Sequence, residues 1–338
     1  MAATSIRDVA ARAGVSVGTV SNVLNHPDKV TAHVAERVHA AIAELRFVRN
    51  DAARQLRVGR SRTIGLIVLD SHNPFFTDVA RGAEDRAADA GLVVMLGNSG
   101  EDVDRESTYL DVFEEQRVRG VLISPFGDVT DRLEAMRQRG MRAVLVDRQS
   151  DDAAFSSVSV DDVAGGALAA GHLMETGRRR LAFVGGPLEI RQVSDRLRGA
   201  ERAIAAASGV SFEVIDVPAL TVLAGRSAGE AIAARAPRDR PDAVIAANDL
   251  VAMGVLQALT MRGSTEIAVP SDIALIGYDD IDFARAAVVP LSSIRQPSEL
   301  IGQTAVDILL EETSDPSLDA RTVVFQPELI VRESTRGS

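Results

Sequence analysis

Residues 6–25 read IRDVAARAGVSVGTVSNVLN, with apolar residues three to four positions apart on both sides of Gly14. This spacing is the period of an amphipathic helix, and Ser5 and Ser16 stand where N-caps of two such helices are favoured. A third helical pattern follows over residues 34–45. We therefore predict an N-terminal unit of three helices containing a helix-turn-helix, whose second helix is built to enter the major groove of DNA.

Charge is distributed unevenly along the 338-residue chain, whose formal net charge is −11. Residues 1–62 contain ten basic and five acidic side chains, so the acidic excess lies in the remainder. A basic segment on an acidic body indicates that the small segment contacts nucleic acid, because phosphate repels the body. An uneven surface without a partner accounts for the charge alone equally well.

Composition excludes several classes of protein. Hydrophobic residues make up 46% and charged residues 25%, as in an ordinary globular protein. The absence of cysteine excludes disulfides, thiolate zinc sites and iron–sulfur clusters. The N-terminus lacks the apolar region of a secretory signal, and no apolar run has the length of a membrane span. A cytoplasmic protein without a membrane partner is expected.

From residue 63 onward, short continuous apolar runs alternate with amphipathic stretches. The runs are TIGLIVL, GLVVML, GVLIS, RAVLV, LAFVGG, DAVIAA and DIALIG. Unalternating runs between helices are typical of parallel strands buried on both faces. They are too numerous for one small sheet. We predict an α/β fold with two similar parallel-sheet lobes, with first-lobe strands up to about residue 160 and second-lobe strands over about 181–277.

Polar residues follow these runs directly, where ligands of open α/β sheets bind. They are Asp70, Ser71, His72, Asn73, Pro74, Phe75, Phe76, Asn98, Ser99, Ser124, Asp147, Arg148, Asn248, Asp249, Tyr278, Asp279 and Asp280. Carboxylates and amides bridge vicinal hydroxyls, arginine donates in a planar fork, and an aromatic face covers the C–H face of a sugar ring. The set therefore favours a polyhydroxylated ligand.

Several of these residues also have a purely structural interpretation. Pro74 fits the first position of a helix, so the two phenylalanines after it can be core. Asp249 is expected to cap the helix after it, which leaves Asn248 as the better ligand candidate. Asp161 and Asp162 are likewise expected to act as caps. We expect His72 to lie at the rim of the ligand crevice beyond the strand ends, and His172 to lie within a helix and contribute to packing.

Catalysis is not expected. Residues 225–229, GRSAG, match a hydrolase nucleophile elbow around Ser227, but the nearest strand ends well before it and all five histidines precede it. A Walker loop needs a lysine after its last glycine, and the only lysine is Lys29. No catalytic residue, metal or cofactor is therefore predicted.

The stretch IRDVAARAGVSVGTVSNVLN, followed by Val30-Thr31 and by AIAELRF before Asn50, resembles the lactose-repressor/galactose-repressor family of bacterial transcription regulators. The resemblance runs essentially end to end. In the body, VLDSHNPFF, LVDRQ, VDDVAGG, AANDLVAMG, IGYDD and SIRQP also resemble ribose-type periplasmic sugar-binding proteins. The resemblance implies a homodimeric regulator, expected to act as a repressor, that binds a near-palindromic double-stranded DNA operator under the control of a small sugar.

The resemblance assigns residues to DNA contact. It implies that Val17, Gly18 and Asn22 face bases and that Thr19, Ser21 and Asn25 lie near phosphates. It also implies a hinge helix over 51–58 that inserts Leu56 into the minor groove, with Ala53 and Arg57 as further DNA-contacting residues. Asn22 stands where arginine is frequent, and Arg49 replaces a usual proline. A flexible linker with an incidental leucine is the alternative for the hinge.

The domain boundaries follow from the same resemblance. It implies a headpiece over 1–60 and a body over 61–338 with a periplasmic-binding-protein-like fold. The first lobe is expected at about 62–161 and 293–322, and the second at about 162–292 and 323–332. The chain end, PELIVRESTRGS, lacks the heptad tail of tetrameric members, so a dimer is expected.

The resemblance also implies the effector site. The matching residues are Asn73, Phe75, Phe76, Asp147, Arg148, Arg196, Asn248, Asp279 and Gln296. A pentose such as ribose is favoured over purines and phosphorylated ligands, with Arg196 and Asp279 as the polar centre of the site. The alternative for that pair is a salt bridge that braces one lobe. The rival function is a sugar-binding protein without a DNA role.

Overall fold

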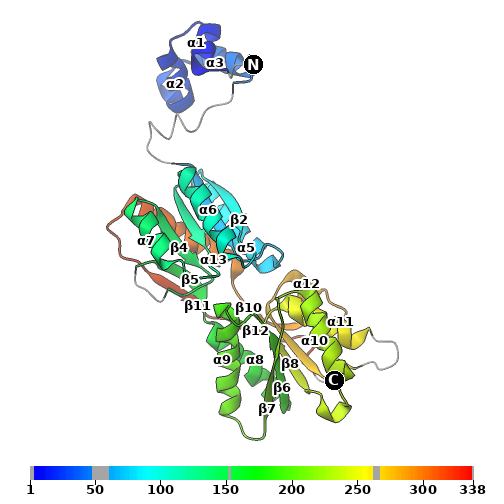
Figure 1. The fold of residues 1–338 in the computed structure, drawn as a ribbon. Helices are drawn as coiled ribbons and strands as arrows, with labels where there is room; N and C mark the ends of the chain where they lie inside the picture. Colours follow the sequence, from blue (N-terminus) through cyan, green and yellow to red (C-terminus); the bar gives the residue numbers. More distant parts are fainter. Residues whose placement is uncertain (1–3, 48–60, 151–153, 262–266, 337–338) are drawn as a thin grey trace. The chain divides into compact units, whose positions relative to one another are not determined.

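The computed structural model describes residues 4–47, 61–150, 154–261 and 267–336. The chain divides into two compact units, Met1–Ser61 and Arg62–Ser338 (Figure 1). In the described ranges, no helix is both long enough and apolar enough to span a membrane.

The N-terminal unit contains α1 (Ile6–Ala13), α2 (Val17–Asn25), the 3₁₀ turn η1 (Pro27–Lys29) and α3 (Ala32–Glu44). Gly14 adopts the left-handed conformation that ends α1, and the Ser16 hydroxyl accepts a hydrogen bond from the Thr19 amide to cap α2. Val9, Val20 and Val38, one from each helix, are fully buried together. The prediction of three helices with a tight turn between the first two is confirmed.

The first lobe of the body is a parallel sheet with helices on both faces. Its strands are β1 (Thr63–Val68), β2 (Val93–Asn98), β3 (Gly120–Ile123), β4 (Arg142–Val146), β5 (Ser156–Val160) and β11 (Thr322–Phe325), in the order β11-β5-β4-β3-β1-β2. Helices α5 (Pro74–Asp89) and α13 (Ser298–Ser314) pack on one face, and α6 (Val103–Glu115) and α7 (Thr130–Gln138) on the other.

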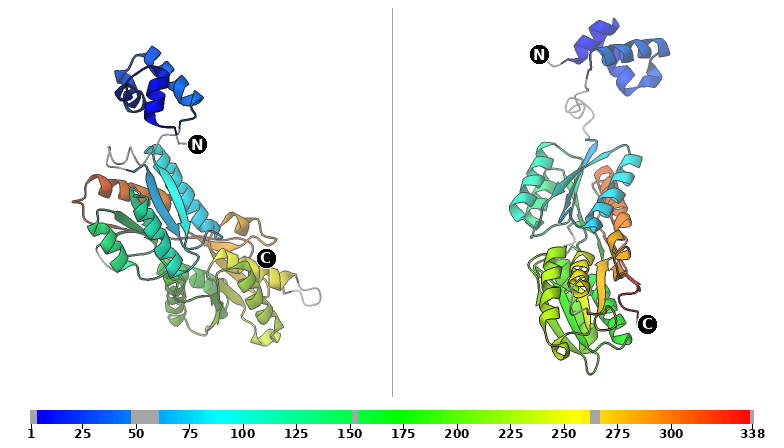
Figure 2. Two further views of the ribbon diagram at one scale, coloured as in Figure 1. Left: turned by 45° about the horizontal axis from the view of Figure 1, so that its top comes forward. Right: turned by 90° about the vertical axis from the view of Figure 1, so that its right-hand side faces the viewer.

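The second lobe repeats this arrangement. Its strands are β6 (Arg180–Gly185), β7 (Ser211–Asp216), β8 (Ala243–Ala246), β9 (Ala274–Asp279), β10 (Ser292–Arg295) and β12 (Glu328–Ile330), in the order β12-β10-β9-β8-β6-β7. Helices α8 (Asp162–Glu175) and α9 (Arg191–Ala205) cover one face, and α10 (Val222–Ala234) and α11 (Asp249–Thr260) cover the other (Figure 2). The short helices η2 (Pro237–Asp239) and α12 (Asp282–Arg285) lie in loops. The predicted α/β fold with two similar lobes is confirmed, although β12 runs antiparallel to β10.

The chain passes between the lobes at residue 161, at residues 296–297 and at residues 326–327. The later two passages differ from the expected boundaries at 293 and 323. Strand β10 pairs with β9 in the second sheet, and β11 pairs with β5 in the first. The sequence pattern does not show which sheet such a strand joins, because the pairing is made by backbone hydrogen bonds to a strand elsewhere in the chain.

Strand β2 differs from the expectation of strands buried on both faces. It is the edge strand of the first sheet, and Val93, Met95 and Leu96 are 58%, 39% and 49% exposed. An edge strand has a neighbour on one side only, so its apolar residues lose part of their cover.

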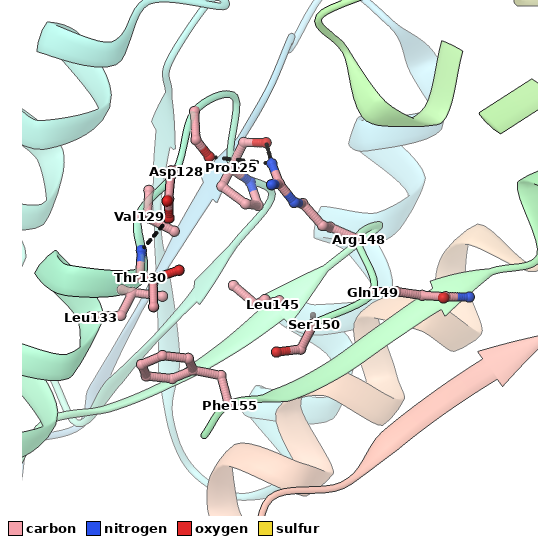
Figure 3. Close-up of a pocket in the computed structure, with 11 residues that line it drawn as sticks. Pro125, Asp128, Val129, Thr130, Leu133, Leu145, Arg148, Gln149, Ser150 and Phe155 are labelled. Atoms are coloured by element: carbon pink, nitrogen blue, oxygen red, sulfur yellow. Dashed lines mark hydrogen bonds between the residues drawn. The ribbon is translucent and has the colours of Figure 1, made fainter. Parts of the chain in front are cut away.

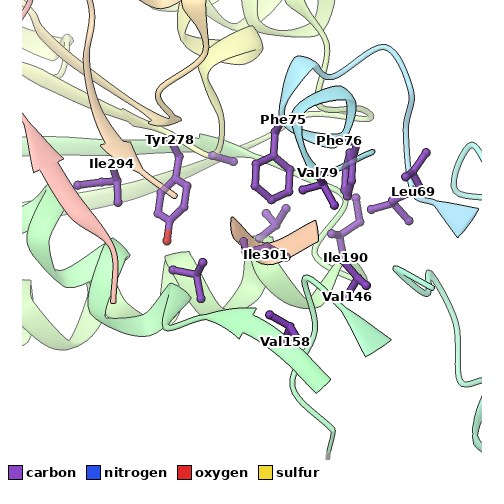
Figure 4. Packing of buried hydrophobic residues seen from close by; sticks show 14 of the residues in the cluster. Leu69, Phe75, Phe76, Val79, Val146, Val158, Ile190, Tyr278, Ile294 and Ile301 are labelled. Atoms are coloured by element: carbon purple, nitrogen blue, oxygen red, sulfur yellow. The ribbon is translucent and has the colours of Figure 1, made fainter. Parts of the chain in front are cut away.

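The apolar core is continuous across the boundary between the lobes. Leu69, Phe76 and Val146 of the first lobe lie beside Ile190 of the second, all in one buried cluster (Figure 4). The strand ends that carry the candidate site therefore meet beside a buried apolar cluster formed by both lobes.

Candidate functional site

Asp279, the last residue of β9, joins both lobes through its two carboxylate oxygens. Oδ2 accepts a hydrogen bond from Asn73 Nδ2 at 3.0 Å, and Oδ1 accepts one from Gln296 Nε2 at 2.8 Å. Asn73 also caps α5 by accepting from the Phe75 amide. The structure thus brings together three of the residues assigned to the effector site, two of them 206 positions apart in the chain.

Arg196 is held by the protein on several sides. Its Nε donates to Asp162 Oδ1 at 2.8 Å, and its Nη1 donates to the Ala247 carbonyl at 2.8 Å and lies 3.8 Å from Asp279 Oδ1. The guanidinium carbon stacks 3.7 Å from the centre of the Tyr278 ring. Burial acts to lower the pKa of Arg196, but the carboxylates around it raise that pKa above the usual value. Arg196 and Asp279 are therefore adjacent, while the carboxylate that accepts a hydrogen bond from Arg196 is that of Asp162.

The structure corrects two expectations about helix caps. Asp161 caps α8, but Asp162 is buried inside the helix start and forms the ion pair with Arg196. At α11 the cap is Asn248, which accepts from the Val251 amide. Asp249 instead accepts from the Ile281 amide and the Ser293 hydroxyl, so it ties α11 to the ends of β9 and β10. In each pair the first residue, Asp161 or Asn248, accepts from an amide of the first helical turn. The carboxylate of the second residue, Asp162 or Asp249, is then available to buried partners.

Asp147 follows β4 and faces the second lobe. Gln192 of α9 donates to both the backbone carbonyl and Oδ2 of Asp147, the latter at 3.0 Å. Oδ1 of Asp147 is buried and has no hydrogen-bond partner in the described part of the chain. Burial raises the pKa of Asp147 well above its usual value, and the nearby Asp162 raises it further, while Arg196 opposes the shift.

Gln192 and Asp162 are the two members of this cluster that sequence reasoning missed. Gln192 precedes Arg196 by four positions, so both lie on one face of α9. That spacing was visible in the sequence, but nothing in it marks this face as the one that meets Asp147.

The remaining assigned residues surround the cluster or lie apart from it. Phe75 and Phe76 are buried with their rings edge to face, 5.1 Å between centroids. Phe75 lines a cavity of about 570 Å³ together with Asp279 and Gln296. Arg148 points elsewhere: its Nη1 donates to the carbonyl of Gly127, and it lines a separate cavity of about 280 Å³ in the first lobe (Figure 3).

The headpiece presents one polar face of α2. Val17, Gly18 and Asn22, the three residues expected to face bases, are exposed. Thr19, Ser21 and Asn25 are half-buried, and Asn25 Nδ2 donates to the Ser21 carbonyl at 2.7 Å. Three further residues assigned to DNA, which are Ala53, Leu56 and Arg57, lie outside the described residues.

The other candidate residues take structural positions. Ser227 lies inside α10, where its hydroxyl donates to the Leu223 carbonyl, and not at a strand-to-helix turn. The His72 side chain is 86% exposed, as expected at a rim. His172 lies in α8 with Nε2 at 2.7 Å from the Thr335 hydroxyl. Within the described ranges, no group of three or more histidine, aspartate or glutamate side chains is arranged to hold a metal ion.

Comparison with known proteins matches both units. Residues 5–50 match the model of bacterial regulatory proteins of the lacI family, and residues 170–335 match a periplasmic binding protein-like domain. The ribose operon repressor of Bacillus subtilis is 35% identical over 334 residues, covering 98% of both chains. The HTH-type transcriptional repressor PurR of Photobacterium profundum is 32% identical, again over 98% of each chain.

Solved structures agree with this assignment. A lac repressor dimer bound to operator and the anti-inducer ONPF is similar with a TM-score of 0.84 and 27% identity, covering 99% of this chain and 100% of that one. A LacI family transcriptional regulator from Enterococcus faecium with bound ribose has a TM-score of 0.73 and 26% identity, over 81% of this chain and 98% of that one. The chain therefore belongs to the lacI family of bacterial regulatory proteins, with a helix-turn-helix unit followed by a periplasmic binding protein-like body.

Proposed function

We propose that this protein is a dimeric repressor whose operator binding is controlled by ribose or a closely similar pentose. The observation that carries the proposal is the buried polar cluster in which Asn73, Asp279 and Gln296 meet across the two lobes. These groups lie at the carboxyl ends of strands, where this type of sheet binds its ligands.

The chemistry of the cluster favours a neutral polyol. Asp147 Oδ1 and Gln296 Oε1 are buried acceptors without partners among the described residues, so each can receive a sugar hydroxyl. Phe75 lines a cavity with Asp279 and Gln296, where its ring would supply an apolar wall for a C–H face of the sugar. A phosphorylated sugar fits poorly, because Asp162 already neutralises Arg196 and the carboxylates around it repel an anion.

Similar proteins support the ligand class. The B. subtilis relative is a ribose operon repressor, and regulators from Enterococcus faecium and Enterococcus faecalis, at 26% and 29% identity, were solved with bound ribose. We carry ribose over to this chain as the first ligand to test.

For DNA, we propose that α2 reads the major groove through its exposed face. Asn22 is suited to a bidentate contact with adenine and Val17 to a thymine methyl group. Thr19, Ser21 and Asn25 would lie near phosphates. In the hinge, Leu56 would insert into the minor groove, and Ala53 and Arg57 would contact DNA beside it. The effector-site assignments of Phe76 and Asn248 remain part of the same proposal, whereas Arg148 is left out of it because its side chain lines the separate cavity of the first lobe.

The edge strand β2 supports the dimer. Its exposed Val93 and Met95 on one face of the strand and Leu96 on the other leave apolar surface at the edge of the sheet that a second copy of this chain would cover. The similar lac repressor structure is a dimer on its operator. Two copies related by a two-fold axis would present two recognition helices to a palindrome.

The test is selection of bound sequences from randomised duplex DNA, with and without D-ribose, with ribose 5-phosphate as the charged control. We expect an imperfect palindrome bound by two chains, with an affinity that D-ribose changes and ribose 5-phosphate leaves unchanged. Affinity should fall roughly 10³-fold or more between 50 and 200 mM salt if six or more phosphates are contacted. A monomeric or salt-independent footprint, or equal effects of the two sugars, would contradict the proposal.

A further inference from the structure

Gln192 connects the two lobes through a single carboxamide. It lies in the first turn of α9 in the second lobe, is 6% exposed, and its Nε2 donates to the carbonyl and Oδ2 of Asp147. Asp147 belongs to the first lobe, where its amide donates to the Val158 carbonyl of β5 at 2.8 Å. A change in the separation of the lobes therefore has to alter this contact.

The contact also determines which oxygen of Asp147 is available. Oδ2 is occupied by Gln192, whereas Oδ1 is buried and without a hydrogen-bond partner in the ranges that the structure describes. The backbone of Asp147 has a φ of 56°, in the left-handed region that non-glycine residues seldom adopt. The position of its carboxylate therefore depends on a restricted backbone conformation. Gln192 thus holds both the backbone and the side chain of Asp147, the residue that follows β4.

We propose that Gln192 is a positioning residue of the effector site, which orients Asp147 across the lobe boundary so that Oδ1 accepts a hydroxyl of the sugar. The inference rests on the proposed function of the cleft as a sugar site. In this role Gln192 acts through Asp147, and its contribution is present only when the lobes are close enough for the carboxamide to reach.

The charged groups that face Asp147 make this role measurable as a pH dependence. Asp162 of α8 and Asp279 of β9 raise the pKa of Asp147 in addition to burial, while Arg196 of α9 and the hydrogen bond from Gln192 lower it. A hydroxyl donor requires the ionised carboxylate as its strongest acceptor. Loss of the Gln192 donor should therefore raise the pKa of Asp147 and move the midpoint of sugar affinity to higher pH.

The experiment measures D-ribose affinity by titration calorimetry between pH 5 and 8 on the full chain, beside a melting curve for each variant. We expect Gln192→Leu to weaken binding roughly tenfold or more at pH 7.5, since a hydrogen bond to a charged group is lost. Its affinity midpoint should also lie at higher pH than that of the original protein. Gln192→Asn, which remains polar but is too short to reach Asp147, should shift both quantities in the same direction.

Ser194→Ala is the matched control. Its hydroxyl donates within α9 to the Arg191 carbonyl, and we expect it to leave both affinity and midpoint unchanged. If folded Gln192 variants lose affinity by one constant factor at every pH, or bind ribose as the original protein does, the positioning role is wrong. If the original protein binds no ribose at all, the proposed function fails and this inference fails with it.

Discussion

At the scale of single residues, the site concentrates negative charge in the interior. Asp147, Asp162, Asp249 and Asp279 are all buried with raised pKa values, and burial is the first cause in each case. Arg196 opposes this rise in pKa for Asp147, Asp162 and Asp279, and it pairs directly with Asp162. Such a cluster of buried carboxylates lowers the folding stability of the ligand-free protein, as is common where binding groups are preformed.

Asp147→Asn should therefore stabilise the ligand-free protein at neutral and alkaline pH. Because the folded pKa of Asp147 is raised, the folded state holds this proton more tightly, and stability falls as pH rises from the unfolded value through the folded value. Asparagine is neutral at every pH, so the variant does not lose folding stability in this way as pH rises. At pH 8 we expect Tm to rise by about 2–4 °C for each kcal/mol gained in the free energy of unfolding. The rise in Tm should become smaller as pH is lowered towards 4.

Melting curves over this pH range test the expectation. Asp128→Asn is the control, because the exposed Asp128 has a pKa lowered by its bonds to Thr130 and gains nothing from neutralisation. Equal melting temperatures for Asp147→Asn and the original protein at pH 8 would show that burial of this carboxylate carries no cost.

At the scale of elements, the position of Arg196 depends on how closely α8 approaches α9. A Cβ added at Gly166 of α8 would lie 1.9 Å from the backbone carbonyl oxygen of Arg196, and one added at Gly199 of α9 would lie 2.0 Å from that of Val163. The two helices therefore touch backbone to backbone. This contact sets the distance between Asp162 at the start of α8 and Arg196 in the middle of α9.

Gly166→Ala should separate the helices, because neither contacting backbone can move out of the way as a flexible side chain would. Overpacking of this kind costs about 1–3 kcal/mol or more, and ribose affinity should fall as Arg196 moves. Gly171→Ala is the matched control on the same helix, where an added Cβ meets nothing within 4 Å. There the greater helix propensity of alanine should stabilise by about 0.5–1 kcal/mol.

Chemical denaturation and ribose titration of the two variants provide the measurement. A Gly166→Ala protein as stable as Gly171→Ala would mean that the helices relax apart without consequence for the site.

At the scale of the whole molecule, the division at Ser61 and Arg62 separates the basic helical unit from the acidic body. Both sheets and the whole buried cluster belong to Arg62–Ser338. The similar ribose-bound regulator from E. faecium covers 81% of this chain, which is close to the share of the body alone.

A chain that begins at Arg62 should consequently fold and bind D-ribose with the affinity of the full chain, while specific DNA binding is lost. Titration calorimetry and a gel-shift assay on the selected operator compare the two chains. Specific operator binding by the shortened chain would show that recognition does not reside in the N-terminal helices.

The sequence alone was sufficient to predict the N-terminal helices, the seven apolar strands and the polar residues at the strand ends. Helix periodicity, capping residues and continuous apolar runs are local properties of the chain. It also carried the family motifs that led to Asn73, Arg196, Asp279 and Gln296. Tertiary structure alone decided that Asp162 pairs with Arg196, that Gln192 reaches Asp147, and that Arg148 turns to another cavity. These outcomes depend on side chains from distant elements meeting in a dry interior, where each buried charge takes whichever partner the packing brings near.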